Sequence, residues 1–143
     1  MSQARPRPLR VLVVEDRDDT RDAFRVLIGL WGHVCEAAAT GAAALRLARA
    51  FRPDVVVMDI GLPDMDGYET ACAMRKLPGL AGAVFVTLTA NGCDDDRERS
   101  HAEGFAAHLV KPTNPAELRK LLDRLASERT PAPGPRLSPE LRG

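Results

Sequence analysis

Residues 54–67 read DVVVMDIGLPDMDG, in which an apolar run ends in an aspartate, Asp59, and a turn containing proline follows. Continuous β-branched runs of this kind are typical of central parallel strands that are covered on both faces. The chain has two more, LRVLVV at 9–14 and AVFVTL at 83–88. An aspartate at the end of such a strand either marks where the strand reaches water or is held there for its chemistry.

Helical patterns alternate with these runs. Apolar side chains recur at i, i+3, i+4 and i+7 in three sets, which are Phe24, Leu27, Ile28 and Trp31; Ala44, Leu47, Ala48 and Phe51; and Leu118, Leu121, Leu122 and Leu125. The motifs DGYE at 66–69 and NPAE at 114–117 each supply an N-cap residue followed three positions later by Glu. Two runs of mixed polarity, HVCEAA at 33–38 and AAHLV at 106–110, suit edge strands. The alternation predicts an α/β fold with a doubly wound, parallel, five-stranded sheet in one domain.

The segment CDDDRERSHAE at 93–103 differs from the other helical patterns. Its acidic residues come first and its basic residues later, which suits the dipole of a helix. It has almost no apolar stripe, so we expect it to be the least anchored helix of the fold.

Length and composition limit what the chain is expected to do. Its 143 residues suffice for one domain, which we place at 9–127 between a disordered arm at 1–8 and a disordered Pro-rich tail at 128–143. Twenty basic and twenty acidic residues cancel, so neither nucleic acid nor a membrane is an expected partner. No apolar run has the length of a membrane span and no secretion signal is present, so a cytoplasmic location is expected. His33 and His101 carry no motif, and we expect both at the surface.

Polar residues follow four of the predicted strands. Glu15 and Asp16 come after the first strand, Asp59 ends the third, Thr89 ends the fourth and Lys111 follows the fifth. Ligands of open parallel sheets bind outside the carboxyl ends of the strands, so these side chains should share one crevice. Any one of them alone is most simply a turn or cap residue, but together their chemistry is complementary.

The predicted crevice holds three carboxylates, which repel one another by about 1–4 kcal/mol per pair at about 4 Å. A hard divalent cation such as Mg²⁺ relieves this repulsion and often completes its shell with phosphate oxygens. Lys111 then offers a point charge and Thr89 a hydrogen-bond donor to a phosphoryl group. Because an aspartate can act as a nucleophile, Asp59 is a candidate to form an aspartyl phosphate.

The ordered set of motifs resembles that of the receiver domain of two-component response regulators. The matching motifs are ED at 15–16, DIGLPDMDG at 59–67, LTA at 88–90 and VKP at 110–112. The resemblance covers about residues 9–127 and implies the flavodoxin-like (βα)5 fold. It implies a phosphoryl acceptor rather than an enzyme, with only self-phosphorylation from phosphodonors and autodephosphorylation. The implied partners are a sensor histidine kinase or histidine phosphotransfer protein and a downstream protein target.

The resemblance also implies a role for each residue of the acidic end of the crevice. Asp59 is the implied phosphoacceptor and a metal ligand. Asp16 is the implied direct ligand to Mg²⁺, with Mn²⁺ as an alternative ion. The backbone carbonyl of Gly61 is a further implied ligand, and Glu15 is implied to act through a water molecule.

The remaining implied roles concern the phosphoryl group and the response to it. Thr89 is the implied switch hydroxyl, the backbone N–H of Ala90 and the ammonium of Lys111 bind the phosphoryl group, and a cis bond is expected before Pro112. His108 departs from the family pattern, because it occupies the position of the switch aromatic, usually Tyr or Phe. The departure questions the usual coupling between the switch hydroxyl and the aromatic ring, but leaves the phosphorylation chemistry unaffected.

Three other functions are consistent with parts of the pattern. The first is a degenerate receiver that is never phosphorylated and acts as a protein-interaction module. The second is an aspartate-nucleophile phosphatase of the haloacid-dehalogenase type, which requires a second Asp at the position where this chain has Gly61. The third is a flavodoxin-like cofactor-binding module, whose phosphate loop would be replaced here by the acidic VEDRDDT at 14–20. Because only 16 residues follow Ser127, we expect a single-domain response regulator without an attached output module.

Overall fold

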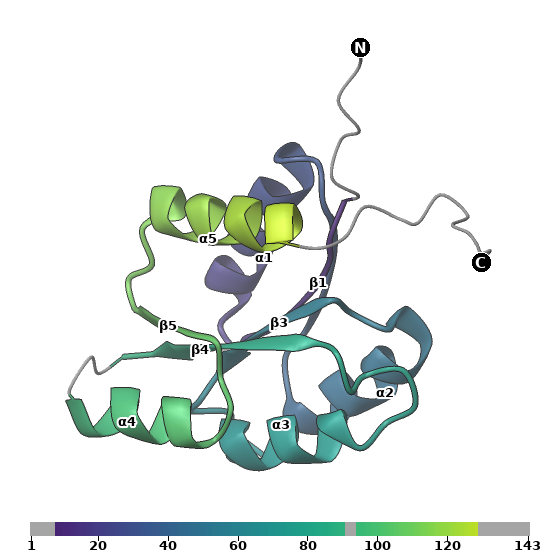
Figure 1. Ribbon diagram of the computed structural model, residues 1–143, viewed down its shortest axis with the longest axis vertical. Helices are drawn as coiled ribbons and strands as arrows, with labels where there is room; N and C mark the ends of the chain where they lie inside the picture. The colour runs from purple at the N-terminus through teal and green to yellow at the C-terminus, as the bar shows by residue number, and fades with distance from the viewer. Residues whose placement is uncertain (1–7, 91–93, 129–143) are drawn as a thin grey trace.

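The computed structural model describes residues 8–90 and 94–128 of the chain. Within them, five parallel strands form one sheet in the order β2-β1-β3-β4-β5 (Figure 1). The strands are β1 (Arg10–Val14), β2 (Val34–Ala38), β3 (Val55–Asp59), β4 (Val84–Thr89) and β5 (Ala107–Val110). The predicted flavodoxin-like (βα)5 sheet is therefore confirmed, with the two runs of mixed polarity at its edges.

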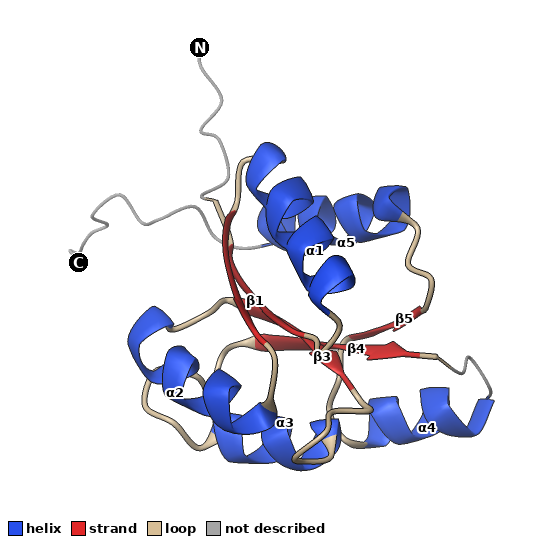
Figure 2. Cartoon of the chain, turned by 180° about the vertical axis from the view of Figure 1, so that it is seen from behind, coloured by secondary structure: helices blue, strands red, loops and turns tan. Residues whose placement is uncertain are grey.

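A helix follows each strand. The helices are α1 (Asp18–Leu30), α2 (Gly41–Phe51), α3 (Gly67–Arg75), α4 (Asp94–Ala102) and α5 (Pro115–Glu128). Helices α1 and α5 cover one face of the sheet, and α2, α3 and α4 lie on the other (Figures 1 and 2). Helix α5 continues one residue beyond the predicted boundary at 127, whereas Cys93 and nearly all of the predicted arm and tail lie outside the described residues.

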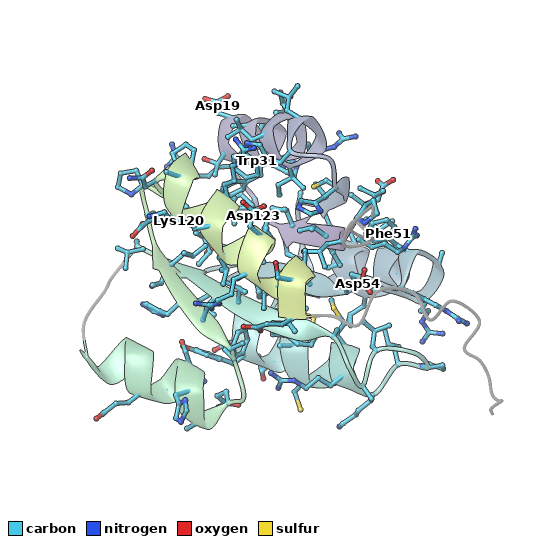
Figure 3. The ribbon with its side chains drawn as sticks, turned by 45° about the horizontal axis from the view of Figure 1, so that its top comes forward. Asp19, Trp31, Phe51, Asp54, Lys120 and Asp123 are labelled. Carbon is cyan, nitrogen blue, oxygen red and sulfur yellow. The ribbon has the colours of Figure 1, made fainter. Side chains whose placement is uncertain are left out.

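Each face of the sheet carries its own apolar core. Alternate side chains of the central strands, such as Val11 and Val13, enter the core under α1 and α5, while Leu12 and Val14 enter the core under α2 and α3. Trp31, just after α1, packs against the first core and lies between α1 and α5 (Figure 3). Strands buried on both faces leave no solvent-facing position, which is why their sequences lack polar alternation.

Side-chain caps begin α3 and α5 as the sequence predicts. Asp66 accepts a 2.6 Å hydrogen bond from the Tyr68 N–H at the start of α3. Asn114 accepts one of 2.8 Å from the Ala116 N–H at the start of α5. Each cap satisfies one of the backbone donors that the first turn of a helix leaves unpaired.

The prediction that His33 lies at the surface is wrong. Its ring is half-buried, and Nδ1 accepts a 3.0 Å hydrogen bond from the Leu9 N–H beside the start of β1. Burial lowers the pKa of His33, and the nearby Asp123 opposes that shift. The turn between α1 and β2 places the ring against β1, a long-range contact that no local pattern reveals.

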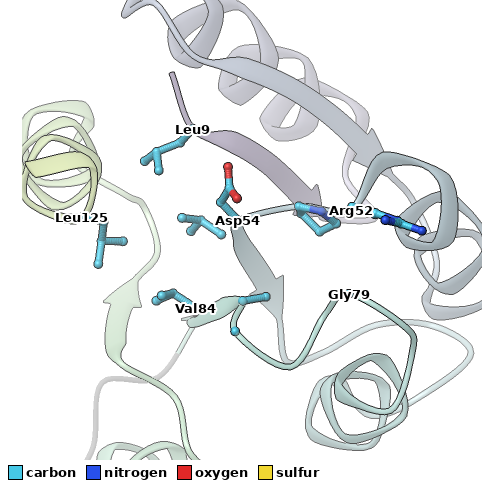
Figure 4. A pocket seen from close by; sticks show the side chains of 10 residues that line it. Leu9, Arg52, Asp54, Gly79, Val84 and Leu125 are labelled. Carbon is cyan, nitrogen blue, oxygen red and sulfur yellow. The ribbon is translucent and has the colours of Figure 1, made fainter. Parts of the chain in front are cut away.

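A cavity of about 260 Å³ opens at the amino ends of β1, β3 and β4 (Figure 4). Leu9, Asp54, Val84 and Leu125 are among the residues that line it. It lies at the opposite end of the strands from the carboxyl ends, where the predicted crevice is. Among the described residues, no helix has the length and apolar character needed to cross a membrane.

Candidate metal and phosphoryl site

A crevice of about 470 Å³ lies at the carboxyl ends of the central strands. It is lined by Asp16, Arg17, Asp59, Ile60, Gly61, Thr89, Ala90 and Lys111. Strand order reverses between β1 and β3, and this is the place where open α/β sheets bind ligands. The structure thus brings together residues from four separate strand ends, as the sequence predicts.

Three carboxylates meet at the acidic end of the crevice. Glu15, Asp16 and Asp59 each place an oxygen within 4.8 Å of the others. Glu15 is fully buried and Asp59 is 4% exposed, whereas Asp16 reaches solvent. Burial raises the pKa of Glu15, although the hydrogen bond from the Arg17 N–H and the contact with Lys111 oppose the shift. Two of these charges are therefore held out of water, which requires compensating groups.

Lys111 provides part of that compensation. Its Nζ lies 2.9 Å from Oδ2 of Asp59 and 3.0 Å from Oε1 of Glu15. Burial acts to lower the pKa of Lys111, but the hydrogen bonds to the two carboxylates outweigh it, and the pKa is raised. The ammonium form is therefore stabilised where it faces both carboxylates.

The loop after β3 is folded against the acid that it follows. The Gly61 N–H donates a 2.9 Å hydrogen bond to Oδ1 of Asp59, and Gly61 itself is exposed at the crevice. On the opposite side, the Lys111 N–H donates to the Thr89 carbonyl at 2.7 Å, and the bond between Lys111 and Pro112 is cis, as expected.

These residues fit a hard divalent cation. The donors at the acidic end are oxygen atoms, and Lys111 contacts two carboxylates while the third, Asp16, remains at the surface of the crevice. Carboxylate oxygens with an open, solvated side match the coordination of Mg²⁺, which keeps several waters. The excess of carboxylates over the ammonium in contact with them is the electrostatic reason for a cation to bind here.

Known proteins share this fold. Residues 11–123 match the response regulator receiver domain family over most of the chain. The chain belongs to this family.

Relatives of this receiver domain include the polar-differentiation response regulator DivK of Brucella anthropi. The two are 34% identical over 105 residues, which are 73% of this chain and 85% of DivK. The structure of chemotaxis protein CheY4 of Vibrio cholerae is similar with a TM-score of 0.77 and 31% identity, covering 82% of this chain and 98% of CheY4. The receiver domain of sensor histidine kinase PA1611 of Pseudomonas aeruginosa, whose structure has a magnesium ion in its active site cleft, has a TM-score of 0.75 and 30% identity. The matched region covers 85% of this chain and 99% of the PA1611 domain.

Around His108, this receiver domain has a hydrogen-bonded polar cluster that sequence reasoning missed. Thr87 Oγ1 and His108 Nδ1 share a 2.8 Å hydrogen bond, and Ser100 Oγ donates to Thr87 Oγ1 at 3.2 Å. Ser100 Oγ and the Tyr68 hydroxyl share another, of 3.1 Å. The cluster joins α3, β4, α4 and β5, so His108 is tied inward rather than placed freely at the edge.

Among residues 98–102 of α4, Ser100 is the one buried side chain, and the polar sequence of the helix does not predict its burial. It is 2% exposed, whereas the other side chains of α4 from Glu98 to Ala102 are exposed. A lone serine in a polar helix gives no sequence signal for burial.

Proposed function

We propose that this receiver domain accepts a phosphoryl group on Asp59 from a phosphohistidine, in a reaction that depends on Mg²⁺. The observation that carries the proposal is the placement of the Asp59 carboxylate. It ends a buried strand, contacts Lys111 at 2.9 Å and lies with Glu15 and Asp16 within 4.8 Å. A buried nucleophile beside a phosphate-binding cation and a candidate metal site is the arrangement that phosphoryl transfer needs.

The chemistry is a displacement at phosphorus. An Asp59 carboxylate oxygen forms a bond to phosphorus, the bond from phosphorus to the histidine nitrogen of the donor breaks, and the imidazole leaves. The product is an acyl phosphate. Lys111 then balances the charge of the phosphoryl oxygens, and the Thr89 hydroxyl and the Ala90 N–H donate hydrogen bonds to them.

The metal would be held by residues of the acidic end. Asp16, Asp59 and the Gly61 carbonyl would bind the ion directly, and Glu15 would act through a water molecule, with Mn²⁺ as an alternative to Mg²⁺. When bound, the ion neutralises charge that develops on the transferring phosphoryl group. The magnesium ion in the PA1611 receiver domain supports this assignment.

The partners follow from the chemistry. The donor is a sensor histidine kinase or a histidine phosphotransfer protein of the cytoplasm, and the output is a changed surface around α4 and β5 that a downstream protein recognises. DivK, named as a response regulator, supports a signalling role of this kind. Catalysis by the domain itself would be confined to its own phosphorylation and dephosphorylation.

Intact-mass measurement after incubation with acetyl phosphate and Mg²⁺ tests the proposal. The wild type should gain one phosphoryl group, and Asp59→Asn should gain none, because an amide is not a nucleophile for this reaction. Asp22→Asn, at an exposed position on α1, is the matched control and should be labelled like the wild type. Labelling of Asp59→Asn at the wild-type level would refute the assignment, and a wild type that is never labelled would favour a degenerate receiver.

A further inference from the structure

Asp64 makes a contact that the phosphorylation chemistry does not require. It lies in the loop between β3 and α3, and its carboxylate reaches the first turn of α2. Oδ1 accepts a 2.8 Å hydrogen bond from the Gly41 N–H, and Oδ2 accepts one of 3.0 Å from the Ala42 N–H. These two hydrogen bonds lower the pKa of Asp64 and so favour its ionised form at the helix N-terminus.

The loop that carries Asp64 is the one that carries Gly61. The two ends of this loop meet, because the Gly67 N–H at the start of α3 donates to the Ile60 carbonyl at 3.2 Å. A Cβ at Gly67 would lie only 2.7 Å from the Asp59 carbonyl oxygen, so the start of α3 packs directly on the backbone of the proposed phosphoacceptor. The two ends of the loop are therefore fixed to each other.

Asp64 and Met65, within the loop, pack against the start of α2. A Cβ at Gly41 would lie 2.8 Å from Thr70 Oγ1 and 3.1 Å from Met65 Cβ, so only glycine allows this close approach. Asp64 adds the two charged hydrogen bonds across the same contact. The loop after Asp59 is thus held between the strand that supplies the acid and a helix that supplies no side chain to the crevice.

We propose that Asp64 is a positioning residue for the metal site, because it latches the loop that bears the Gly61 carbonyl onto the N-terminus of α2. The inference rests on the proposed function only in its metal site. A ligand carbonyl that is already fixed loses less conformational freedom when the ion binds, and contacts outside the ligand set commonly change metal affinity by about 10–100-fold. Asp64 lies outside the group of three acids that meet in the crevice and acts through the loop.

Titration with Mg²⁺, followed by the NMR shift of the Gly61 amide, measures metal affinity without any phosphorylation. Asp64→Ala should weaken Mg²⁺ binding by about 3–10-fold, the lower part of the range for contacts beyond the ligands. Asp64→Asn keeps one oxygen acceptor and should restore part of the loss. Hydrogen exchange of the amides at 61, 62, 64 and 65 in the metal-free protein should be faster in Asp64→Ala than in the wild type.

Thr40→Ala is the matched control, because Thr40 Oγ1 caps the same helix through a 3.1 Å hydrogen bond from the Ala43 N–H, within the helix and its N-cap. It should weaken α2 and leave Mg²⁺ affinity unchanged. Wild-type affinity in Asp64→Ala, or an equal loss in Thr40→Ala, would overturn the positioning role. If Asp64→Ala does not fold, wild-type affinity in Asp64→Asn has the same meaning.

The two proposals fail in different ways. Mg²⁺ binding that depends on Asp64 in a protein that acetyl phosphate never labels would contradict the phosphoryl chemistry and leave the latch supported. Labelling of Asp59 with an affinity for Mg²⁺ that ignores Asp64 would contradict the latch alone. A wild type that binds no Mg²⁺ would overturn the latch, because there would be no site to position.

Discussion

Lys111 balances two buried acids of the crevice at once. Its Nζ is within 3.0 Å of both Glu15 and Asp59, and its side chain is 23% exposed. Removing one partner of a buried ionic group is more damaging than the net value of the contact, because the other charges stay buried without compensation. The ammonium is therefore a structural group in the metal-free protein as well as a proposed phosphoryl ligand.

Lys111→Met should lower the free energy of unfolding of the metal-free protein by about 1–3 kcal/mol. Mg²⁺ should recover part of this loss, since it replaces the missing positive charge. Urea unfolding with and without Mg²⁺ measures both effects. Lys120→Met, at an exposed position of α5 (Figure 3), is the control, and an equal loss in that variant would show that the crevice is not the cause.

His33 gives the fold a dependence on pH. Its pKa is lowered by burial, and its Nδ1 accepts a hydrogen bond that protonation would remove. The unfolded chain therefore takes up a proton near the ordinary histidine pKa of about 6.5, before the folded protein does. Stability should be complete above that pH and should fall as the pH drops from it towards the lowered folded value.

Urea unfolding at several pH values, in wild type and His33→Gln, isolates this contribution from those of the carboxylates. The glutamine variant should lose less stability than the wild type between neutral pH and mildly acidic pH. Replacement of His101, which is exposed, should leave the wild-type pH dependence unchanged. Parallel pH profiles for the wild type and His33→Gln would show that the ring does not titrate differently in the folded protein.

At the scale of elements, the sequence predicted what depends on local chemistry. The buried β-branched runs, the apolar stripes of α1 and α5 and the caps Asp66 and Asn114 all appear where their patterns place them. The strand-end acids were predicted to meet because parallel strands align their carboxyl ends. Two other contacts between distant elements could not be predicted. The contact of Asp64 with α2 and that of Ser100 with β4 depend on packing that no local pattern encodes.

The packing of helix α4 on the rest of the domain can be tested at a single residue. Over residues 98–102 its one buried side chain is Ser100, which bonds to Tyr68 and Thr87. Ser100→Ala removes the hydroxyl and leaves the buried Thr87 and Tyr68 groups with fewer partners.

Ser100→Ala should lower the free energy of unfolding by about 1–2 kcal/mol. Hydrogen exchange should speed up relative to the wild type more in 98–106 than in the rest of the protein. The same experiment on Ser127→Ala, an exposed position of α5, should show neither effect. Faster exchange spread evenly over all helices in Ser100→Ala would mean that the cluster does not anchor α4 in particular.

For the molecule as a whole, the sheet concentrates negative charge at one end of its strands. Three carboxylates converge there, whereas the cavity at the other end is lined mainly by apolar and backbone groups around Asp54 and Arg52 (Figure 4). Binding of an ion to the folded state alone must raise stability by mass action, by about 2.7 kcal/mol at 100 times the dissociation constant.

Mg²⁺ should therefore raise the melting temperature of the wild type in a concentration-dependent manner. Asp16→Asn should blunt the rise, because it removes a proposed ligand while the exposed side chain contributes little to packing. Differential scanning calorimetry over a series of Mg²⁺ concentrations measures the effect. A melting temperature that is indifferent to Mg²⁺ in the wild type would contradict a metal site in the crevice.

The central claim is that the phosphoryl group resides on Asp59. Borohydride reduces an aspartyl phosphate to homoserine, so reduction after treatment with acetyl phosphate and Mg²⁺, followed by peptide mass spectrometry, locates the modified residue. Homoserine at position 59, and absent when Mg²⁺ is withheld, is the predicted result. Homoserine at Asp16 or at another aspartate, with position 59 unchanged, would contradict the account.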